Sequence, residues 1–276
     1  MKHALLVATF VSALPLAAIA ADPPPPPKQG WSGSGELGMA AASGNTKSQN
    51  LNAKLDVKYN DDRWKDDFYL LALRNKANVS KTTVDTSTTP PTTITHTNYQ
   101  LTADRYEAGA SAGYKLDDHS YIVGALRYEH DQFSPYDHQS IVSLGYGYQV
   151  MKNAHDELAL EVGAGYKTVQ PTSYYLANPT PPPDLIRVQP DSDSSAAGRG
   201  KVDYKHSFNA STSFVDTLLV ESASGNTFMQ NDAGLAVKMN SNLALKLGYQ
   251  LRHNSDVLAG FKHTDQLVTT NLVYGF

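Results

Sequence analysis

The chain has 276 residues, a formal net charge of −4 at pH 7 and no cysteine. The lack of cysteine excludes disulfide scaffolds and thiol chemistry, and the nearly balanced charge lacks the basic footprint of a nucleic-acid-binding protein. Tyrosine is the commonest aromatic residue, with 16 Tyr against 8 Phe and 2 Trp. Its amphipathic side chain suits a boundary between an apolar layer and water.

Residues 1–20 have the pattern of a secretory signal peptide. A positive start at Lys2 is followed by an apolar run over Leu5–Ile19 and the small-residue cleavage site Ala18-Ile19-Ala20. A transmembrane helix is disfavoured because the run is short and contains Pro15. We therefore predict export and cleavage after Ala20, with cleavage after Ala21 as the alternative.

Residues 21–30 form a proline-rich lead-in. Five consecutive prolines, Pro23–Pro27, favour a polyproline II spacer. The segment could also be a ligand for a proline-binding module, but a stiff connection to the folded domain is the favoured interpretation.

Residues 31–276 divide into segments whose polarity alternates with a period of two, the pattern of β-strands with two different faces. We predict twelve strands, at Trp31–Ala41, Ser48–Asn60, Arg63–Ala77, Thr97–Leu116, Ser120–Asp131, His138–Met151, Glu157–Thr168, Ser195–Ser207, Thr212–Ser222, Thr227–Met239, Leu243–Asn254 and Thr264–Phe276.

The connections between these strands differ in length in a regular way. Long connections follow the third, fifth, seventh and eleventh strands, among them polar stretches at 78–95 and 169–193, whereas connections after even strands are short and rich in Asp, Asn and Ser. Membrane barrels combine long outer loops with short periplasmic turns, while a soluble β-sandwich has no reason to do so. The fold class predicted is therefore all-β, a transmembrane antiparallel up-and-down β-barrel with both chain ends at the periplasmic side.

One face of most strands carries charge and is predicted to line the lumen. The predicted lumen-lining residues are Lys54, Asp56, Lys58, Arg127, Glu161, Arg199, Lys201, Lys205, Lys246 and Arg252, with Glu36, Glu129, Lys167, Asp203 and Lys238 as further candidates. Basic residues outnumber acidic ones in this set, so a water-filled lumen would favour anions. The alternative, which is slightly favoured, is that the charges pair and leave the barrel plugged or very narrow.

The last strand ends on alternating aromatic residues. Tyr274 and Phe276 resemble the C-terminal signal that the barrel-insertion machinery reads in outer-membrane proteins. Both are predicted to serve assembly rather than activity.

The opening of the predicted barrel resembles a known family. Trp31-Ser-Gly-Ser-Gly-Glu-Leu-Gly38, the turn Ser43-Gly-Asn-Thr46 and the Leu-rich second strand are similar to the YdiY-like, salt-stress-induced outer-membrane protein family, whose members carry a domain of unknown function. The resemblance implies an outer-membrane barrel over about 31–276 and brings no catalytic residues.

Polar residues after the fifth strand could be combined into an acid–base site. His130, Asp131, Ser134, Asp137 and His138 lie close in the sequence, but they match neither the omptin-type proteases nor outer-membrane phospholipase A. A catalytic role is therefore not predicted, nor is a cofactor or a metal site, since the pairs His253/Asp256 and His263/Asp265 lack further ligands.

Together these patterns predict a monomer in the outer membrane of a Gram-negative bacterium. Its partners would be membrane lipid and, during assembly, periplasmic chaperones and the insertion machinery. The expected role is a structural, envelope-stress or narrow anion-permeable barrel. The alternatives are an outer-rim enzyme acting on lipid or peptide, and a surface adhesion or receptor protein that uses 78–95 and 169–193.

Overall fold

The fold is described by a computed structural model that covers residues 29–43, 47–87, 89–177, 185–257 and 261–276. The predicted signal peptide, most of the proline-rich lead-in and residues 44–46 of the predicted first turn lie outside these ranges. The part of the chain that is described contains no helix long and apolar enough to cross a membrane.

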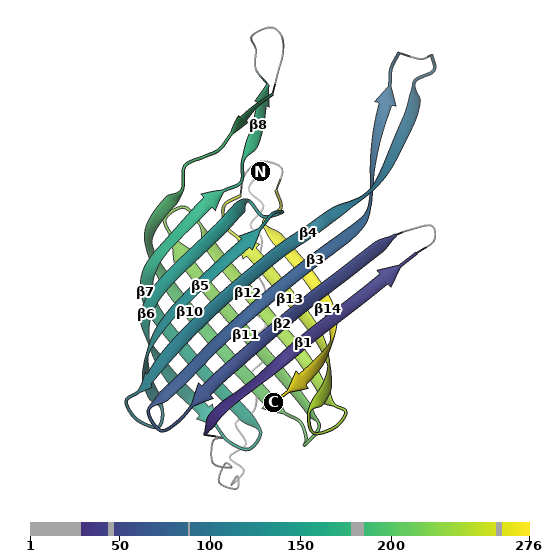
Figure 1. The fold of residues 1–276 in the computed structure, drawn as a ribbon. Helices are drawn as coiled ribbons and strands as arrows, with labels where there is room; N and C mark the ends of the chain where they lie inside the picture. The colour runs from purple at the N-terminus through teal and green to yellow at the C-terminus, as the bar shows by residue number, and fades with distance from the viewer. Residues whose placement is uncertain (1–28, 44–46, 88, 178–184, 258–260) are drawn as a thin grey trace, which may run out of the picture.

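Twelve strands form one closed antiparallel barrel, which confirms the predicted fold class (Figure 1). Each strand pairs with its neighbours in chain order, β7 pairs with β10, and β14 closes the sheet against β1. The barrel strands are β1 (Gly30–Ala42), β2 (Ser48–Asn60), β3 (Trp64–Asp85), β4 (Thr92–Lys115), β5 (Ser120–Asp131), β6 (Tyr136–Lys152), β7 (Asp156–Pro171), β10 (Asp193–Ser207), β11 (Thr212–Ala223), β12 (Thr227–Lys238), β13 (Leu243–Asn254) and β14 (Thr264–Gly275).

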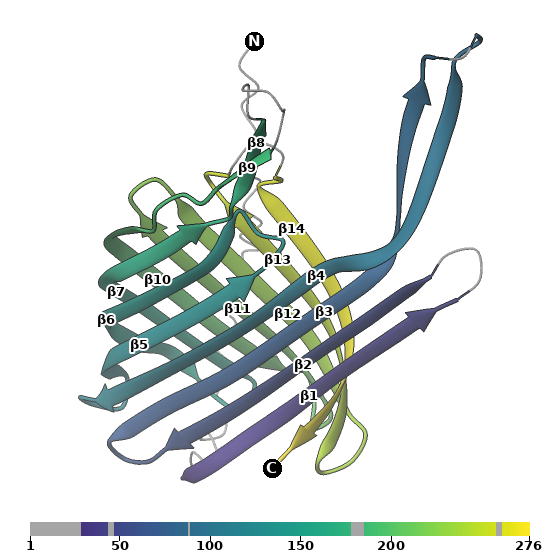
Figure 2. The ribbon, with the colours of Figure 1, turned by 45° about the horizontal axis from the view of Figure 1, so that its top comes forward.

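The prediction of a polar loop at 78–95 is wrong for most of that stretch. β3 continues to Asp85 and β4 begins at Thr92, so the two strands extend as a ribbon beyond the barrel (Figures 1 and 2). Hydroxyl pairs join the ribbon, Ser80 to Thr97 at 2.8 Å and Thr82 to Thr95 at 3.0 Å. Threonine is β-branched and fits a pleated strand, which explains why a polar segment is regular here.

The connection predicted at 169–193 also contains strands. β7 continues to Pro171, and β8 (Tyr174–Ala177) pairs with β9 (Leu185–Val188) in a separate two-stranded sheet. Both extensions lie at the same end of the barrel, which we call the loop end (Figure 1).

The opposite end, the turn end, is built from five short turns of the same design. In each, an Asp or Asn side chain accepts hydrogen bonds of 2.6 to 2.9 Å from the backbone N–H groups two and three residues later. The residues are Asp61, Asp117, Asn153, Asn209 and Asn240. The side chain satisfies donors that the tight turn would otherwise leave free, which explains the Asp and Asn content of these connections.

Two of these turns carry charge and are therefore sensitive to pH. Backbone N–H donors hold the pKa values of Asp61 and Asp117 below their usual range. A carboxyl group whose pKa is lower in the folded state than in the unfolded state stabilises the folded state at pH values above its unfolded pKa. This contribution is lost as the pH falls through its folded pKa. The contribution of these two aspartates is therefore present at neutral pH and is lost as the pH falls below the ordinary range of an aspartate pKa.

The outer surface of the barrel is an apolar band bordered by aromatic side chains. Exposed residues such as Val142, Leu144 and Val162 form the band. At the turn end, Trp31 packs on Tyr59 and Trp64 on Tyr114, while Tyr106 packs on Tyr128 toward the loop end. Apolar bands between aromatic girdles are the lipid-facing surface of transmembrane barrels.

The seam between β1 and β14 is the shortest pairing in the barrel. Ser34–Leu37 pair with Gly275–Leu272, and Gly33 and Phe276 exchange two backbone hydrogen bonds of 2.9 and 3.0 Å. The Phe276 ring lies over Gly33, so close that a β-carbon added at Gly33 would be 2.5 Å from it. Glycine at this position therefore makes room for the ring that covers the end of the seam.

The seam gives the first testable prediction. Gly33→Val should displace the Phe276 ring, press on the Asp56 carbonyl at 2.8 Å, and lower the temperature at which the folded barrel loses its fast gel mobility by several degrees. Gly35→Val is the matched control, since a β-carbon at Gly35 meets nothing within 4 Å. Equal unfolding temperatures for the two variants would show that the ring contact does not support the seam.

Candidate functional site

Alternate residues of each strand point into the barrel. In this chain most of the charged strand residues occupy these inward positions. Inward residues of the strands line one cavity of about 250 Å³. Among its walls are seven basic residues, Lys54, Lys58, Arg105, Arg127, Arg199, Lys201 and Lys246, and six acidic residues, Glu36, Asp56, Asp67, Glu107, Asp203 and Asp232. The cavity wall is thus close to neutral.

Toward the loop end, buried charges from several strands meet across the interior. We call this set the charged layer; it consists of Arg105 and Glu107 of β4, Arg127, Glu129 and Asp131 of β5, Lys167 of β7, Glu221 of β11 and Arg252 of β13. With four basic and four acidic members, the layer has no net charge.

The strongest pair in the layer joins β5 to β11. Arg127 donates from Nε and Nη2 to the two carboxylate oxygens of Glu221, at 2.9 and 2.6 Å. Lys167 donates to the same carboxylate at 3.0 Å. The Glu221 side chain is 0% exposed, and planar two-point pairing of this kind is both strong and directional.

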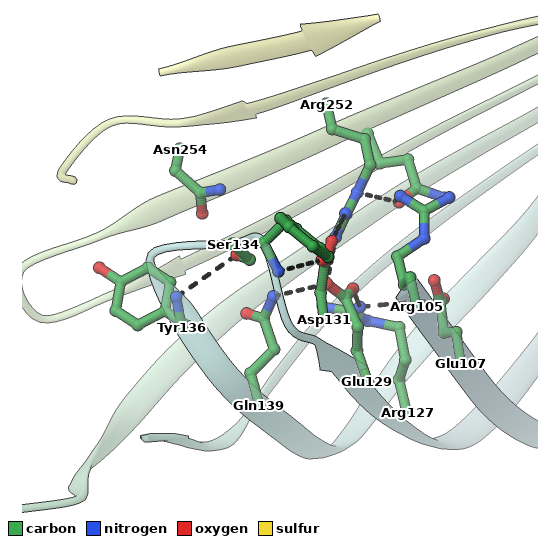
Figure 3. Close-up of polar contacts among 12 residues, drawn as sticks. Arg105, Glu107, Arg127, Glu129, Asp131, Ser134, Tyr136, Gln139, Arg252 and Asn254 are labelled. Carbon is green, nitrogen blue, oxygen red and sulfur yellow. Dashed lines mark hydrogen bonds and ion pairs between the residues drawn. The ribbon is translucent and has the colours of Figure 1, made fainter. Parts of the chain in front are cut away.

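Glu129 connects this pair to β13. It accepts from Arg127 Nη1 at 2.7 Å and from Arg252, which also binds Asp131 at 3.1 Å (Figure 3). Gln139 of β6 donates to Glu129 at 3.3 Å. These contacts link β5 and β6 across the interior to β11 and β13, which are not their neighbours in the sheet.

Phe228 of β12 lies at the centre of the charged layer and is fully buried. The ring centroid is 4.7 Å from the Arg127 guanidinium, 5.1 Å from that of Arg252 and 5.2 Å from the Lys167 ammonium. Cations held against a desolvated ring face are stabilised by its quadrupole. The ring also fills space that water would otherwise occupy at this level of the interior.

Charges nearer the turn end are more accessible. Lys58 pairs with Asp67 at 3.5 Å, and the Lys58 side chain is 58% exposed. Lys54 binds Asp56 at 3.1 Å and Lys246 binds Glu36 at 2.7 Å. The side chains of both lysines are partly exposed. The interior therefore changes from a wet turn half to a dry charged layer.

The predicted lumen residues occupy three kinds of place. Lys54, Asp56, Lys58, Arg127, Arg199, Lys201 and Lys246 line the cavity. Glu161 accepts from Arg199 at 3.0 Å and from Tyr121, and Arg252 belongs to the charged layer. Lys205 pairs with Glu157 near the turn end, where both side chains are about half exposed.

Sequence reasoning missed several central members of the layer. Arg105 and Glu107 lie on β4, where Ala and Gly on both faces hide the alternation, and Glu221 and Phe228 are the isolated charged and aromatic residues of their inward faces. Arg105, Glu107 and Lys115 are separated by even numbers of residues, so the sequence already indicated that they share one face of the strand. No local pattern marks Glu221 as the partner of Arg127, which is 94 residues away.

The structure separates the residues of the possible acid–base site. His130 lies on the outer face, where it packs on Tyr106, whereas the adjacent Asp131 points inward to Arg252. Asp137 is 3.2 Å from His138 and 3.8 Å from His130, but within the described chain no contact joins these histidines to Ser134. The arrangement does not assemble a nucleophile with its base.

The histidines near the last hairpin also do not form a ligand set. His253 and His263 stack at 6.1 Å, and their Nδ1 atoms contact Thr264 and a backbone carbonyl. Among the described residues there is no group of three or more His, Asp or Glu side chains placed to hold a metal ion.

Comparison with known proteins places the sequence in a family without an assigned activity. The family model described as "Protein of unknown function, DUF481" matches residues 35–276. The uncharacterized protein YdiY of Escherichia coli (strain K12) is 23% identical over 254 residues, which cover 92% of this chain and 86% of that protein.

Solved structures with a similar shape are outer-membrane proteins of low sequence identity. The NanC porin is 11% identical with a TM-score of 0.40, covering 89% of this chain and 97% of that one. The translocator domain of the autotransporter NalP from Neisseria meningitidis is 12% identical with a TM-score of 0.45, covering 90% and 88%. The COG4313 outer membrane channel from Pseudomonas putida F1 is 12% identical with a TM-score of 0.43, covering 92% and 97%.

The charged layer gives the second prediction. Glu221→Gln should lower the free energy of unfolding by about 3–5 kcal/mol, because Lys167 loses its buried counter-charge and Arg127 loses its two-point carboxylate partner. Urea titration of the barrel in lipid vesicles measures the change. The control Glu157→Gln breaks an exposed pair with Lys205 and should cost less than about 1 kcal/mol. Similar losses in both variants would contradict the argument that burial makes the layer essential.

Proposed function

We propose that this chain, which belongs to the DUF481 family, is an outer-membrane barrel that holds a wet vestibule behind a closed layer of ion pairs. The observation that carries the proposal is the charged layer, most of it buried, around the fully buried Phe228 ring. Barrels of this strand number lie between small ones filled by side chains and open porins, so the side chains decide whether a path exists. Here the layer makes the resting barrel non-conducting or very narrow.

The proposed orientation follows from the two ends of the barrel. Short turns face the periplasm in outer-membrane barrels and longer loops face outward. The five Asx turns, the start of β1 and the end of β14 share one end, whereas the β3–β4 ribbon and the β8–β9 hairpin share the other (Figure 1). The wet half of the interior would then open toward the periplasm, and the charged layer would lie toward the outer surface.

Assembly in this orientation would follow the route of other exported barrels. The signal peptide predicted at 1–20 would direct export, and periplasmic chaperones would carry the chain to the insertion machinery. The end of β14, with Tyr274 and Phe276, would be the strand that the machinery reads; its packing on Gly33 supports a place in closure of the sheet.

A weak preference for anions is part of the proposal. Although the cavity wall has almost equal numbers of acidic and basic residues, the cations reach further into the solvent. Of the ion pairs formed by Lys54, Lys58, Arg199, Lys201 and Lys246, four have a cation that is more exposed than its acidic partner. A permeating ion therefore meets mainly ammonium and guanidinium groups, which attract anions.

The extended ribbon supports a second candidate function at the cell surface. β3 and β4 expose Val84 and Ile94 beyond the barrel, and the ribbon is far longer than hairpin closure requires. Such a ribbon could present a binding surface to a partner outside the cell. Replacing residues 79–97 by a short turn should then abolish partner binding and leave the barrel folded, whereas unchanged binding would rule out this role.

Planar-bilayer recording tests the closed layer. The double variant Arg127→Ala/Glu221→Ala keeps the net charge but removes the two-point pair, and it should raise single-channel conductance about tenfold over the parent barrel. Phe228→Ala, which changes no charge, should raise conductance in the same direction.

The matched control is Lys205→Ala/Glu157→Ala, which removes one ion pair near the turn end and should leave conductance unchanged. Heat-dependent gel mobility establishes that each variant is folded. A parent barrel that already conducts as well as the variants would contradict the closed layer, and a reversal potential that indicates cation preference would contradict the anion preference.

A further inference from the structure

A groove lies on the outer face of the barrel, away from the interior cavity. It has a volume of about 430 Å³ and lies over β1–β3 near the loop end. Its side chains are Met39, Ala41, Gln49, Leu51, Arg74 and Lys76. Met39, Ala41 and Leu51, together with the aliphatic parts of the Arg74 and Lys76 side chains, form the apolar surface of the groove. The charged ends of Arg74 and Lys76 lie next to this surface.

Strand register shows that these side chains face the lipid and not the lumen. Met39, Leu51 and Arg74 are directly opposite one another across β1, β2 and β3, and residues opposite in register share a face. Lys54 and Asp56, which line the cavity, are odd numbers of residues from Leu51 and so point to the other face. The groove is therefore on the membrane side of the sheet.

The level of the groove matches the edge of the membrane. Tyr106, which belongs to the loop-end aromatic girdle with Tyr128, is opposite Ala72. Arg74 and Lys76 follow Ala72 on the same face, two and four residues closer to the loop end. Aromatic girdles lie at the headgroup level, so these cations lie at or just outside it.

Among the described residues, the two cations in the groove have no counter-charge within ion-pair distance, unlike most cations of the interior. Within the described chain, neither Arg74 nor Lys76 has a carboxylate oxygen within 4.0 Å. Asp104 is opposite Arg74 in register but forms no ion pair with it among these residues. Lys47, further toward the loop end, adds a third positive charge over the Tyr99 ring at 4.4 Å. Unpaired positive charge at headgroup level, above apolar surface, matches an anionic lipid.

We propose that this groove binds the phosphate-bearing headgroup of an anionic membrane lipid. Arg74 and Lys76 hold the phosphate, the Arg74 guanidinium being suited to two-point contact with its oxygens. The acyl chains run from Leu51 toward the turn end over Leu55 and Leu70, which are exposed on the same outer face. The site is independent of the state of the interior and so goes beyond the closed-vestibule proposal.

Native mass spectrometry of the full barrel in detergent tests the site. The barrel is incubated with phosphatidylglycerol or with phosphatidylcholine of the same acyl chains, and bound lipids are counted. The parent should retain the anionic lipid about tenfold better than the zwitterionic one, and Arg74→Gln/Lys76→Gln should lose this preference. Soluble glycerol phosphate, which lacks chains, should not displace the bound lipid.

The control variant is Lys81→Gln/Arg187→Gln, which removes one Lys and one Arg from the loop-end extensions β3 and β9. It changes the net charge equally and should keep the preference. The proposal is overturned if the groove variant still prefers the anionic lipid, if both variants lose the preference together, or if glycerol phosphate displaces the lipid as efficiently as phosphatidylglycerol does.

Discussion

The need to satisfy every backbone hydrogen bond in lipid is the constraint on which this structure depends. Hydrocarbon offers no partner for a free N–H or C=O group, so a sheet that crosses a membrane must close on itself. In this barrel the closing contact is small: β1 and β14 pair over a few residues that end at Gly33 and Phe276. The absence of a side chain at Gly33 admits the ring that covers the seam. The other barrel pairings are longer and follow hairpins or, at β7–β10, one extended connection.

Closure produces a second problem, which is how to fill the interior. Charged residues that point into a narrow lumen lose water and need partners, since isolated buried charges are costly. The hydration of the paired charges differs between the two ends of the barrel. Near the turn end, pairs such as Lys58–Asp67 remain wet, whereas the charged layer around Phe228, which includes Arg127, Glu221 and Glu129, is dry and neutral as a whole. Pairing offsets the desolvation cost of burying these charges, and removal of one member leaves its partner buried without that counter-charge. This property makes the layer suitable as a closure.

The outer face of the barrel carries two cations without ion-pair partners among the described residues, in contrast to the paired charges of the interior. Arg74 and Lys76 lie on the lipid side without counter-charges among the described residues, at the level where headgroups replace hydrocarbon. Most interior cations have carboxylate partners on the protein itself, whereas Arg105 donates to the neutral side chain of Gln250. The contrast indicates that the groove cations obtain theirs from the membrane, which links the outer surface to lipid chemistry without involving the lumen.

The sequence by itself determined the twelve barrel strands and the class of fold, but not the strand extensions beyond the barrel. Period-two alternation and Asp or Asn turns are local, so Ser48–Asn60, Ser120–Asp131 and Leu243–Asn254 were predicted with the bounds that the structure shows. Alternation also distinguishes His130 from Asp131 in principle, because consecutive strand residues point to opposite faces. Only the tertiary structure decided which inward charges meet. Arg127 reaches Glu221 across the lumen because strand number, tilt and register together set which residues share a level. Those quantities belong to the closed sheet as a whole and cannot be derived from any one strand.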